Sequence, residues 1–166
     1  DENKEFELTF EPTYKAYLFK DNLKKSIIHP VNITERYYED GRYCCKFNGT
    51  NQYIMTGYSS AFNINKEDFA LGFKVKIESF NNSYQYILAS GGDDSAFGSR
   101  PFIRIVGTQA SEGSPRTLEI GDTTSVWLTV TGLTLGENEV TIYRKGQVLS
   151  VLLNGERVAN ITGFNK

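Results

Sequence analysis

The sequence lacks the signatures of membrane-spanning and nucleic-acid-binding proteins. Its longest apolar runs are only a few residues long, such as 151–153, whereas a membrane-spanning helix needs roughly 20 residues. The 18 Lys and Arg residues nearly balance the 20 Asp and Glu residues, so the formal net charge is only −2. Proteins that bind nucleic acids usually present a clustered basic face instead. The composition therefore argues against both a membrane span and a nucleic-acid partner.

Cysteine and histidine are also scarce. The chain has two adjacent cysteines, Cys44 and Cys45, and a single histidine, His29. Neighbouring residues of a strand point to opposite faces, so the two thiols cannot easily bond to each other. The histidine has no second histidine to share a zinc ion with, and no nucleophile motif lies near it. The sequence therefore predicts no disulfide framework, no zinc site and no histidine-dependent catalysis.

Aromatic residues, by contrast, are plentiful. The 11 Phe and 10 Tyr residues bring the aromatic share to 13%, and aromatic side chains pack well in strands. At 166 residues the chain is long enough for one domain with a proper core and short for two. Composition thus favours a single all-β domain.

The clearest strand pattern runs through residues 140–158. Apolar and polar residues alternate there, and two glycine turns interrupt them, at Lys145-Gly146 and Asn154-Gly155. Such residue pairs tolerate the positive φ of tight turns, and Asn-Gly between alternating apolar residues is the strongest short-range hairpin signal. We therefore expect two strands joined by a tight turn, followed by the start of a third.

Short alternating segments recur along the rest of the chain, with almost no helical period. Many short strands at this spacing are typical of a β-sandwich of two antiparallel sheets. Residues 1–41 are mostly polar and are expected to be a lead-in segment that packs on the same domain, which residues 42–166 form. Strands are expected at 6–10, at 14–19, on both sides of a hairpin turn at 48–51, and at 69–77, 84–90, 101–107, 117–122 and 125–133.

Three pieces of the sequence, in order, resemble a known family. They are CKFNGTNQYI at 45–54, DFALGFKVKI at 68–77 and GENEVTIYRKGQVLSVLLNGERV at 136–158. Together they resemble the strands and hairpins of laminin-G-like domains in the concanavalin A-like jelly-roll superfamily. The resemblance implies a jelly roll of two antiparallel sheets that binds carbohydrate or protein outside the cell. In some branches of the superfamily it also implies a calcium ion at the rim.

The chain departs from that family pattern in three ways. Asn138 and Lys74 occupy positions where the family has tryptophan, and Lys166 ends the sequence where the family continues with a further strand pair. An unpaired sheet edge is an aggregation hazard. We therefore expect residues 6–19 to supply the missing strands.

The single tryptophan marks the first candidate binding place. Alternation places Trp127 on the polar face of the strand 125–133, opposite Val126 and Leu128. Its flat ring, together with Arg104, is expected to stack on a sugar or on a partner protein. The other interpretation is that the lead-in segment or a neighbouring loop covers the ring.

A glycine-rich loop marks the second candidate place. Asp93 and Asp94 follow two glycines there, and carboxylates with backbone carbonyls are the ligands that Ca²⁺ prefers. The alternating Asp spacing of calcium-binding loops is absent, so a solvated turn is the other interpretation. These two residues are the predicted metal ligands.

Catalysis has weaker support than binding. Glycoside hydrolases need two carboxylates that face each other across the scissile bond. The nearest pair, Glu119 and Asp122, is three positions apart and is therefore expected on opposite faces of a strand. Glycoside hydrolysis is accordingly the least favoured function.

The favoured function is a non-catalytic carbohydrate-binding or adhesion module, extracellular or at the cell surface, whose partner is a glycan or a surface protein. A structural or protein-interaction domain of a larger surface assembly or phage appendage stays open as the alternative. The acidic residues of the segment 1–5 resemble the start of mature surface lipoproteins of some bacteria. This composition fits a cell-surface location.

Overall fold

The computed structural model shows a chain built from β-strands. Every regular element in the described residues is a strand, which confirms the all-β prediction, and no helix among them is apolar and long enough to cross a membrane. The chain separates into two compact units, residues 1–64 and 65–166, whereas the sequence suggested a boundary after residue 41. The described residues are 8–12, 17–21, 28–33, 36–39, 42–56, 68–80, 84–89, 101–106 and 116–165.

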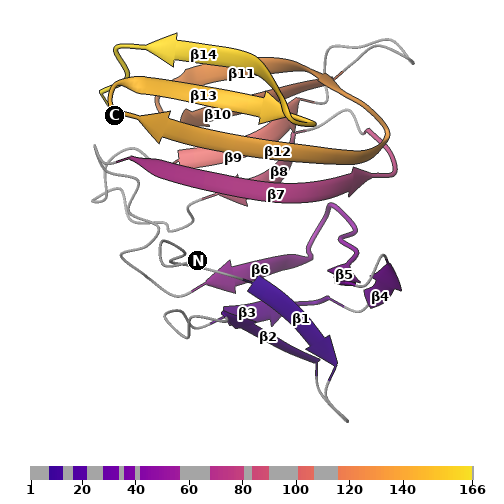
Figure 1. Cartoon of the computed structure of the whole chain (residues 1–166). Coiled ribbons are helices and arrows are strands. Elements are labelled where there is room, and N and C mark those ends of the chain that lie inside the picture. The colour runs from indigo at the N-terminus through magenta and orange to yellow at the C-terminus, as the bar shows by residue number, and fades with distance from the viewer. Residues whose placement is uncertain are drawn as a thin grey trace. The chain divides into compact units, whose positions relative to one another are not determined.

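The first unit contains antiparallel strand pairs (Figure 1). In its described residues each strand pairs with one other strand only, so no larger sheet forms there. The pairs are β1 (Leu8–Pro12) with β2 (Tyr17–Asp21), β3 (Ile28–Val31) with β6 (Tyr53–Thr56), and β4 (Arg36–Glu39) with β5 (Arg42–Cys45).

The prediction of a hairpin around residues 48–51 is wrong, although both of the predicted strands exist. β5 pairs with β4, and β6 pairs with β3. The connection 46–52 is longer than a two-residue hairpin loop, and its own polar contacts shape it. The backbone N–H groups of Thr50 and Asn51 donate to Oδ1 of Asn48 at 2.9 and 3.2 Å, and Nε2 of Gln52 donates to the Asn32 carbonyl oxygen at 2.8 Å. This contact ties the loop to the end of β3.

The strands expected at 6–10 and 14–19 exist with slightly shifted bounds, as β1 and β2. They pair with each other, with Phe10 opposite Phe19. Among the described residues neither strand joins a four-stranded sheet. Contrary to expectation, they do not add strands to either large sheet, because a short local hairpin satisfies their hydrogen bonds at less entropic cost than a distant pairing.

The second unit contains two four-stranded antiparallel sheets (Figure 1). Sheet I has the order β11-β10-β9-β8, and sheet II has the order β14-β13-β12-β7. Sheet I comprises β8 (Gln85–Ala89), β9 (Pro101–Val106), β10 (Arg116–Asp122) and β11 (Val126–Leu133), and sheet II comprises β7 (Phe69–Ile77), β12 (Gly136–Lys145), β13 (Val148–Leu153) and β14 (Glu156–Thr162).

The hairpin predicted in residues 140–158 is confirmed at the centre of sheet II. β12 pairs with β13 from Val140, opposite Leu153, to Lys145, and β13 pairs in turn with β14. Asn154 and Gly155 have φ values of 53° and 85°, which is the positive φ at both central residues that a type I′ turn requires. The Asn-Gly signal therefore predicted this turn correctly.

A shared core joins the two sheets. Alternate residues of both sheets point inward and form one cluster in which each side chain is at least nine-tenths buried. Burying one such aliphatic side chain is worth about 1.5–3 kcal/mol. Because two sheets pack on one shared core, the second unit is a β-sandwich-like fold. The cluster consists of Ile77, Ile103, Ile105, Leu118, Ile120, Leu128, Val130, Leu133, Val140, Ile142, Leu149, Val151, Leu153 and Phe164.

The connectivity of the sandwich is simple in its described strands. Sheet I is a meander of consecutive strands, and sheet II is a meander of β12–β14 to which β7 is added beside β12. The jelly-roll connectivity stays a prediction.

Asn138, at one of the positions where laminin-G-like domains have tryptophan, is fully buried. Its Nδ2 donates to the carbonyl oxygens of Thr134 and Gly136 at 2.9 and 3.0 Å, which closes the turn between β11 and β12.

Candidate functional site

The outer face of sheet I carries a row of polar and aromatic side chains. Ile103 of β9 points into the core, so strand alternation turns Arg104 outward. Tyr86 on β8 lies opposite Arg104, and Arg104 lies opposite Glu119 on β10. Cross-strand neighbours of this kind lie close enough to interact. The three side chains therefore form a ladder across the sheet.

Arg104 is the centre of this ladder. Its Nε donates to Oε2 of Glu119 at 2.8 Å, and its Nη2 forms an ion pair with the same oxygen at 2.7 Å. Its Nη1 donates to the hydroxyl oxygen of Tyr86 at 3.2 Å. The guanidinium and carboxylate side chains are only 16% and 18% exposed. These contacts hold the guanidinium in one orientation.

Aromatic rings surround the same guanidinium. Its Cζ lies 3.8 Å from the ring centroid of Tyr84 and 4.4 Å from that of Phe102. The rings of Tyr86 and Phe102 meet edge to face, with centroids 6.2 Å apart. Cations within about 6 Å of an aromatic centroid are attracted to the ring. We call Tyr84, Tyr86, Phe102, Arg104 and Glu119 the tyrosine–arginine platform.

A glycine makes room for the base of the platform. Phe102 is only 8% exposed, although it lies outside the sandwich core. It pairs with Gly121 of β10, and a Cβ at Gly121 would lie 2.9 Å from Cζ of Phe102 and 2.5 Å from the carbonyl oxygen of Ser125. The phenyl ring therefore occupies the space that a side chain would fill.

The platform is electrostatically compensated. Partial burial alone would lower the pKa of the Arg104 guanidinium, but the hydrogen bonds to Tyr86 and Glu119 and the charge of Glu119 outweigh it and raise this pKa. The guanidinium stays protonated, and the Glu119 carboxylate balances its charge. The most solvent-exposed residues of the platform are the two tyrosines, with Tyr84 46% and Tyr86 55% exposed. The arrangement offers flat aromatic surface beside fixed polar groups.

Trp127 lies in a different cluster. Ile120 pairs with Leu128, and the next pair is Gly121 with Val126, which leaves Trp127 as the extra residue of a β-bulge. A bulge re-aims side chains. Val126 is 43% exposed, whereas Trp127 is partly buried against the core. The alternation expected at the start of β11 is therefore wrong.

The indole ring of Trp127 packs against Phe164, with ring centroids 5.2 Å apart and planes at 64°. Phe164 itself is 5% exposed and belongs to the core. The described partners of Arg104, by contrast, are Tyr84, which precedes β8, and residues of β8, β9 and β10. The structure thus does not bring the two predicted ligand residues together, and the ligand role of Trp127 stays a prediction.

The other candidate residues have separate outcomes. Asp93 and Asp94 lie outside the described residues, so their calcium role stays a prediction. The part of the chain that the structure describes holds no cluster of three or more His, Cys, Asp or Glu side chains suited to a metal ion. Glu119 pairs with Arg104. Asp122 is buried, and its Oδ1 accepts hydrogen bonds from the backbone N–H groups of Thr124 and Ser125 at the turn between β10 and β11.

Tyr84 and Tyr86 are the site residues that sequence reasoning missed. Their spacing of two positions at the start of a strand signals a common face. That signal alone does not reveal a site, because the tyrosines meet Arg104 only through the register of β8 with β9.

Comparison of the chain with protein-family models and with curated proteins finds no match.

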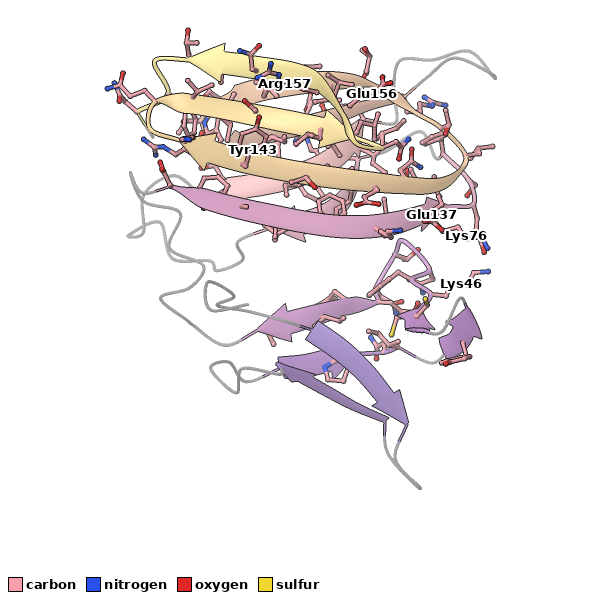
Figure 2. All side chains as sticks on the ribbon, viewed as in Figure 1. Lys46, Lys76, Glu137, Tyr143, Glu156 and Arg157 are labelled. Carbon is pink, nitrogen blue, oxygen red and sulfur yellow. The ribbon has the colours of Figure 1, made fainter. Side chains whose placement is uncertain are left out.

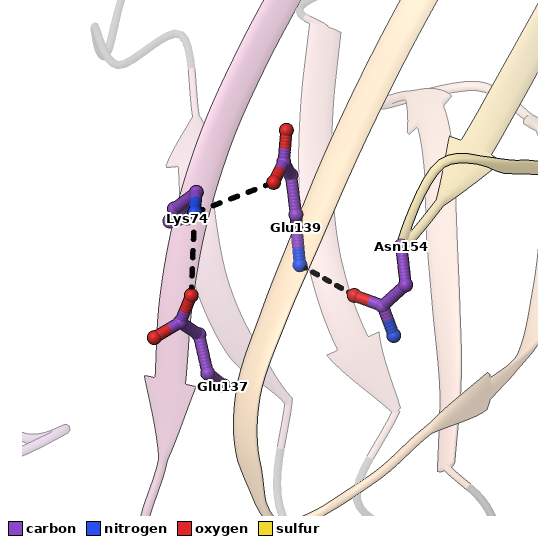
Figure 3. Close-up of polar contacts among 4 residues, drawn as sticks. All are labelled: Lys74, Glu137, Glu139 and Asn154. Atoms are coloured by element: carbon purple, nitrogen blue, oxygen red, sulfur yellow. Dashed lines mark hydrogen bonds and ion pairs between the residues drawn. The ribbon is translucent and has the colours of Figure 1, made fainter.

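Sheet II carries a second polar cluster on its outer face. Nζ of Lys74 lies 3.4 Å from Oε1 of Glu137 and 3.4 Å from Oε2 of Glu139 (Figure 3). These side chains are about half exposed, and Figure 2 shows Lys76 beside Glu137 at the same end of the sheet. The bonds to Glu137 and Glu139 raise the pKa of Lys74. The cluster is a solvated ladder of charges rather than a pocket.

Replacing Lys74 with glutamine is expected to lower the melting temperature only slightly, because exposed ion pairs contribute little. The difference should vanish in about 1 M salt, where the Debye length is roughly 3 Å. Because the pKa of Lys74 is raised on folding, the difference should be present below the unfolded pKa and disappear as the pH rises through the folded pKa. Thermal unfolding at two salt concentrations measures it. Lys145→Gln is the control, since Lys145 is exposed and has no ion pair within the described residues.

Proposed function

We propose that the second unit is a non-catalytic carbohydrate-binding module and that glycans bind at the tyrosine–arginine platform. The observation that carries the proposal is the pair of exposed tyrosines, Tyr84 and Tyr86, fixed by one guanidinium that Glu119 holds in place. A pyranose ring has an apolar face of C–H groups and a rim of hydroxyls. Flat aromatic rings beside fixed hydrogen-bonding groups suit both parts.

Preorganisation supports this site over the rest of the described surface. A ligand that binds to mobile side chains loses affinity to the entropy of ordering them. Here the Arg104 side chain already makes two hydrogen bonds and lies against two rings. The platform therefore needs little rearrangement to receive a flat ligand.

The laminin-G-like resemblance supports the finer parts of the proposal. Such domains are jelly rolls that act outside the cell, and the sandwich-like fold of the second unit fits that class. We therefore propose an extracellular or cell-surface location and a role in adhesion. Calcium at Asp93 and Asp94 belongs to the same proposal.

Alanine in place of Tyr84 or Tyr86 is expected to weaken glycan binding about tenfold for each substitution, which corresponds to about 1.4 kcal/mol and is the scale of one aromatic contact. A glycan array identifies a ligand, and isothermal titration then measures the affinities. Tyr53→Ala is the matched control, because Tyr53 is 50% exposed and belongs to the first unit. Equal affinities for the Tyr84, Tyr86 and Tyr53 variants would place the glycan elsewhere.

Protein recognition by the same platform is the second candidate function. Tyrosine and arginine are the residues that most often dominate protein–protein interfaces, and Val126, which pairs with Gly121 beside the platform, adds exposed apolar surface. An array on which no glycan binds, combined with light scattering that shows an oligomer dissociated by Tyr86→Ala, would favour this function. It would also exclude the carbohydrate proposal.

A further inference from the structure

The charge state of the platform bears on the kind of glycan that it binds. Sites for acidic sugars need a cation whose charge is available to the ligand. Arg104 is the only cation with described contacts in the platform, and its Nε and Nη2 both meet Oε2 of Glu119. Its positive charge is therefore already compensated, and a ligand carboxylate or sulfate would also approach the negative charge of Glu119.

The same pair keeps hydrogen-bonding capacity for neutral groups. Nη1 of Arg104 carries two N–H groups, of which one donates to Tyr86. Oε1 of Glu119 accepts no hydrogen bond within the part of the chain that the structure describes. At least one fixed donor and one fixed acceptor thus remain on neighbouring strands. A hydroxyl both donates and accepts, so two vicinal hydroxyls of a sugar match this pair.

We infer that the platform selects neutral glycans with vicinal hydroxyls and discriminates against uronic and sulfated ones; this rests on the proposed function. The pyranose ring stacks on Tyr84 and Tyr86. One hydroxyl accepts from Nη1 of Arg104, and its neighbour donates to Oε1 of Glu119. Because neither ligand nor site carries net charge, binding depends little on ionic strength.

The test compares matched polysaccharides. Neutral glucan, mannan and galactan are titrated beside a polyuronate and a sulfated galactan, at low and high ionic strength. The expected result is that at least one neutral polysaccharide binds with an affinity that salt does not change. The charged polysaccharides are expected to bind at least about tenfold more weakly, because the negative charge of Glu119 repels them.

Glu119→Gln separates charge from shape. Glutamine keeps an acceptor for Arg104 and nearly the same volume, but it leaves the guanidinium charge uncompensated. This variant is expected to weaken neutral-glycan binding a few-fold and to strengthen binding of the acidic polysaccharides about tenfold, with a new dependence on salt. Glu137→Gln on sheet II, an exposed residue outside the platform, is the control and changes neither affinity.

The outcomes separate the two proposals. If the unmodified protein binds an acidic polysaccharide more tightly than any neutral one, the selectivity inference is wrong while the carbohydrate function stands. If Glu119→Gln leaves acidic binding unchanged, Glu119 does not set the selectivity. If no polysaccharide of either class binds, the proposed function fails and the inference fails with it.

Discussion

Replacing Phe164 with alanine is expected to lower the free energy of unfolding by about 3–5 kcal/mol, the range for removing a buried phenylalanine. Phe164 is 5% exposed, belongs to the sandwich core and packs against Trp127. Its backbone is bonded as well, since its N–H donates to the Gln147 carbonyl oxygen at 2.9 Å and its carbonyl oxygen accepts from Nη2 of Arg144 at 3.2 Å. The cavity left by the ring therefore cannot close by a simple shift of the segment after β14.

Urea unfolding followed by tryptophan fluorescence measures this effect. Trp127 is the only tryptophan and contacts Phe164, so its emission in the folded variant also reports the loss of the neighbouring ring. Phe47→Ala is the matched control, because Phe47 is 45% exposed and belongs to the first unit. We expect the control to change stability by less than about 0.5 kcal/mol. Superimposable urea curves for Phe164→Ala and the unmodified protein would show that Phe164 is not a core residue.

Replacing Gly121 with alanine is expected to cost about 3 kcal/mol, the upper part of the range for overpacked sites. A Cβ there would lie 2.5 Å from the carbonyl oxygen of Ser125 and 2.9 Å from Cα of Val126. These are backbone atoms at the bulge of β11, so they cannot rotate away as a side chain would. The new methyl group would also lie 2.9 Å from Cζ of Phe102 and displace the base of the platform.

Two measurements check the Gly121 substitution. Thermal unfolding should show the loss of stability, and glycan titration should show weaker binding at a temperature where the variant remains folded. Gly72→Ala is the control, since the nearest atoms to its Cβ would be Oγ1 of Thr141 at 3.7 Å and the Val140 carbonyl oxygen at 4.0 Å. That substitution should be neutral or slightly stabilising. Equal melting temperatures for the two variants would contradict the packing described at Gly121.

Local sequence patterns predicted the elements of this fold better than their partners. The Asn154-Gly155 turn and the pairing of β12 with β13 could be predicted, because both depend on residues close in the chain. The pairing of β5 with β4 and of β6 with β3 could not, because side-chain contacts of Asn48 and Asn32 shape the intervening loop. The choice among partners of similar strand character depends on such tertiary contacts.

The candidate site shows the same limit. Arg104 was predicted as a ligand-binding residue, but the tyrosines that meet it belong to the segment 84–86, whose register with β9 no local pattern reveals. Trp127 was placed on the outer face because a β-bulge cannot be read from alternation. Gly121 illustrates the cause, since its lack of a side chain matters only once Phe102 lies over it.

The position of β7 beside β12 has a consequence for folding kinetics. Their register joins Ile77 to Gly136, so this pairing closes a loop that contains all of sheet I, whereas β12, β13 and β14 close only short turns. Closing a long loop costs more entropy than closing a short one, and pairings distant in sequence form slowly. The meander of β12–β14 is therefore the natural nucleus of sheet II. The sheet is complete only when β7 joins it. Until then one edge of β12 has no strand partner.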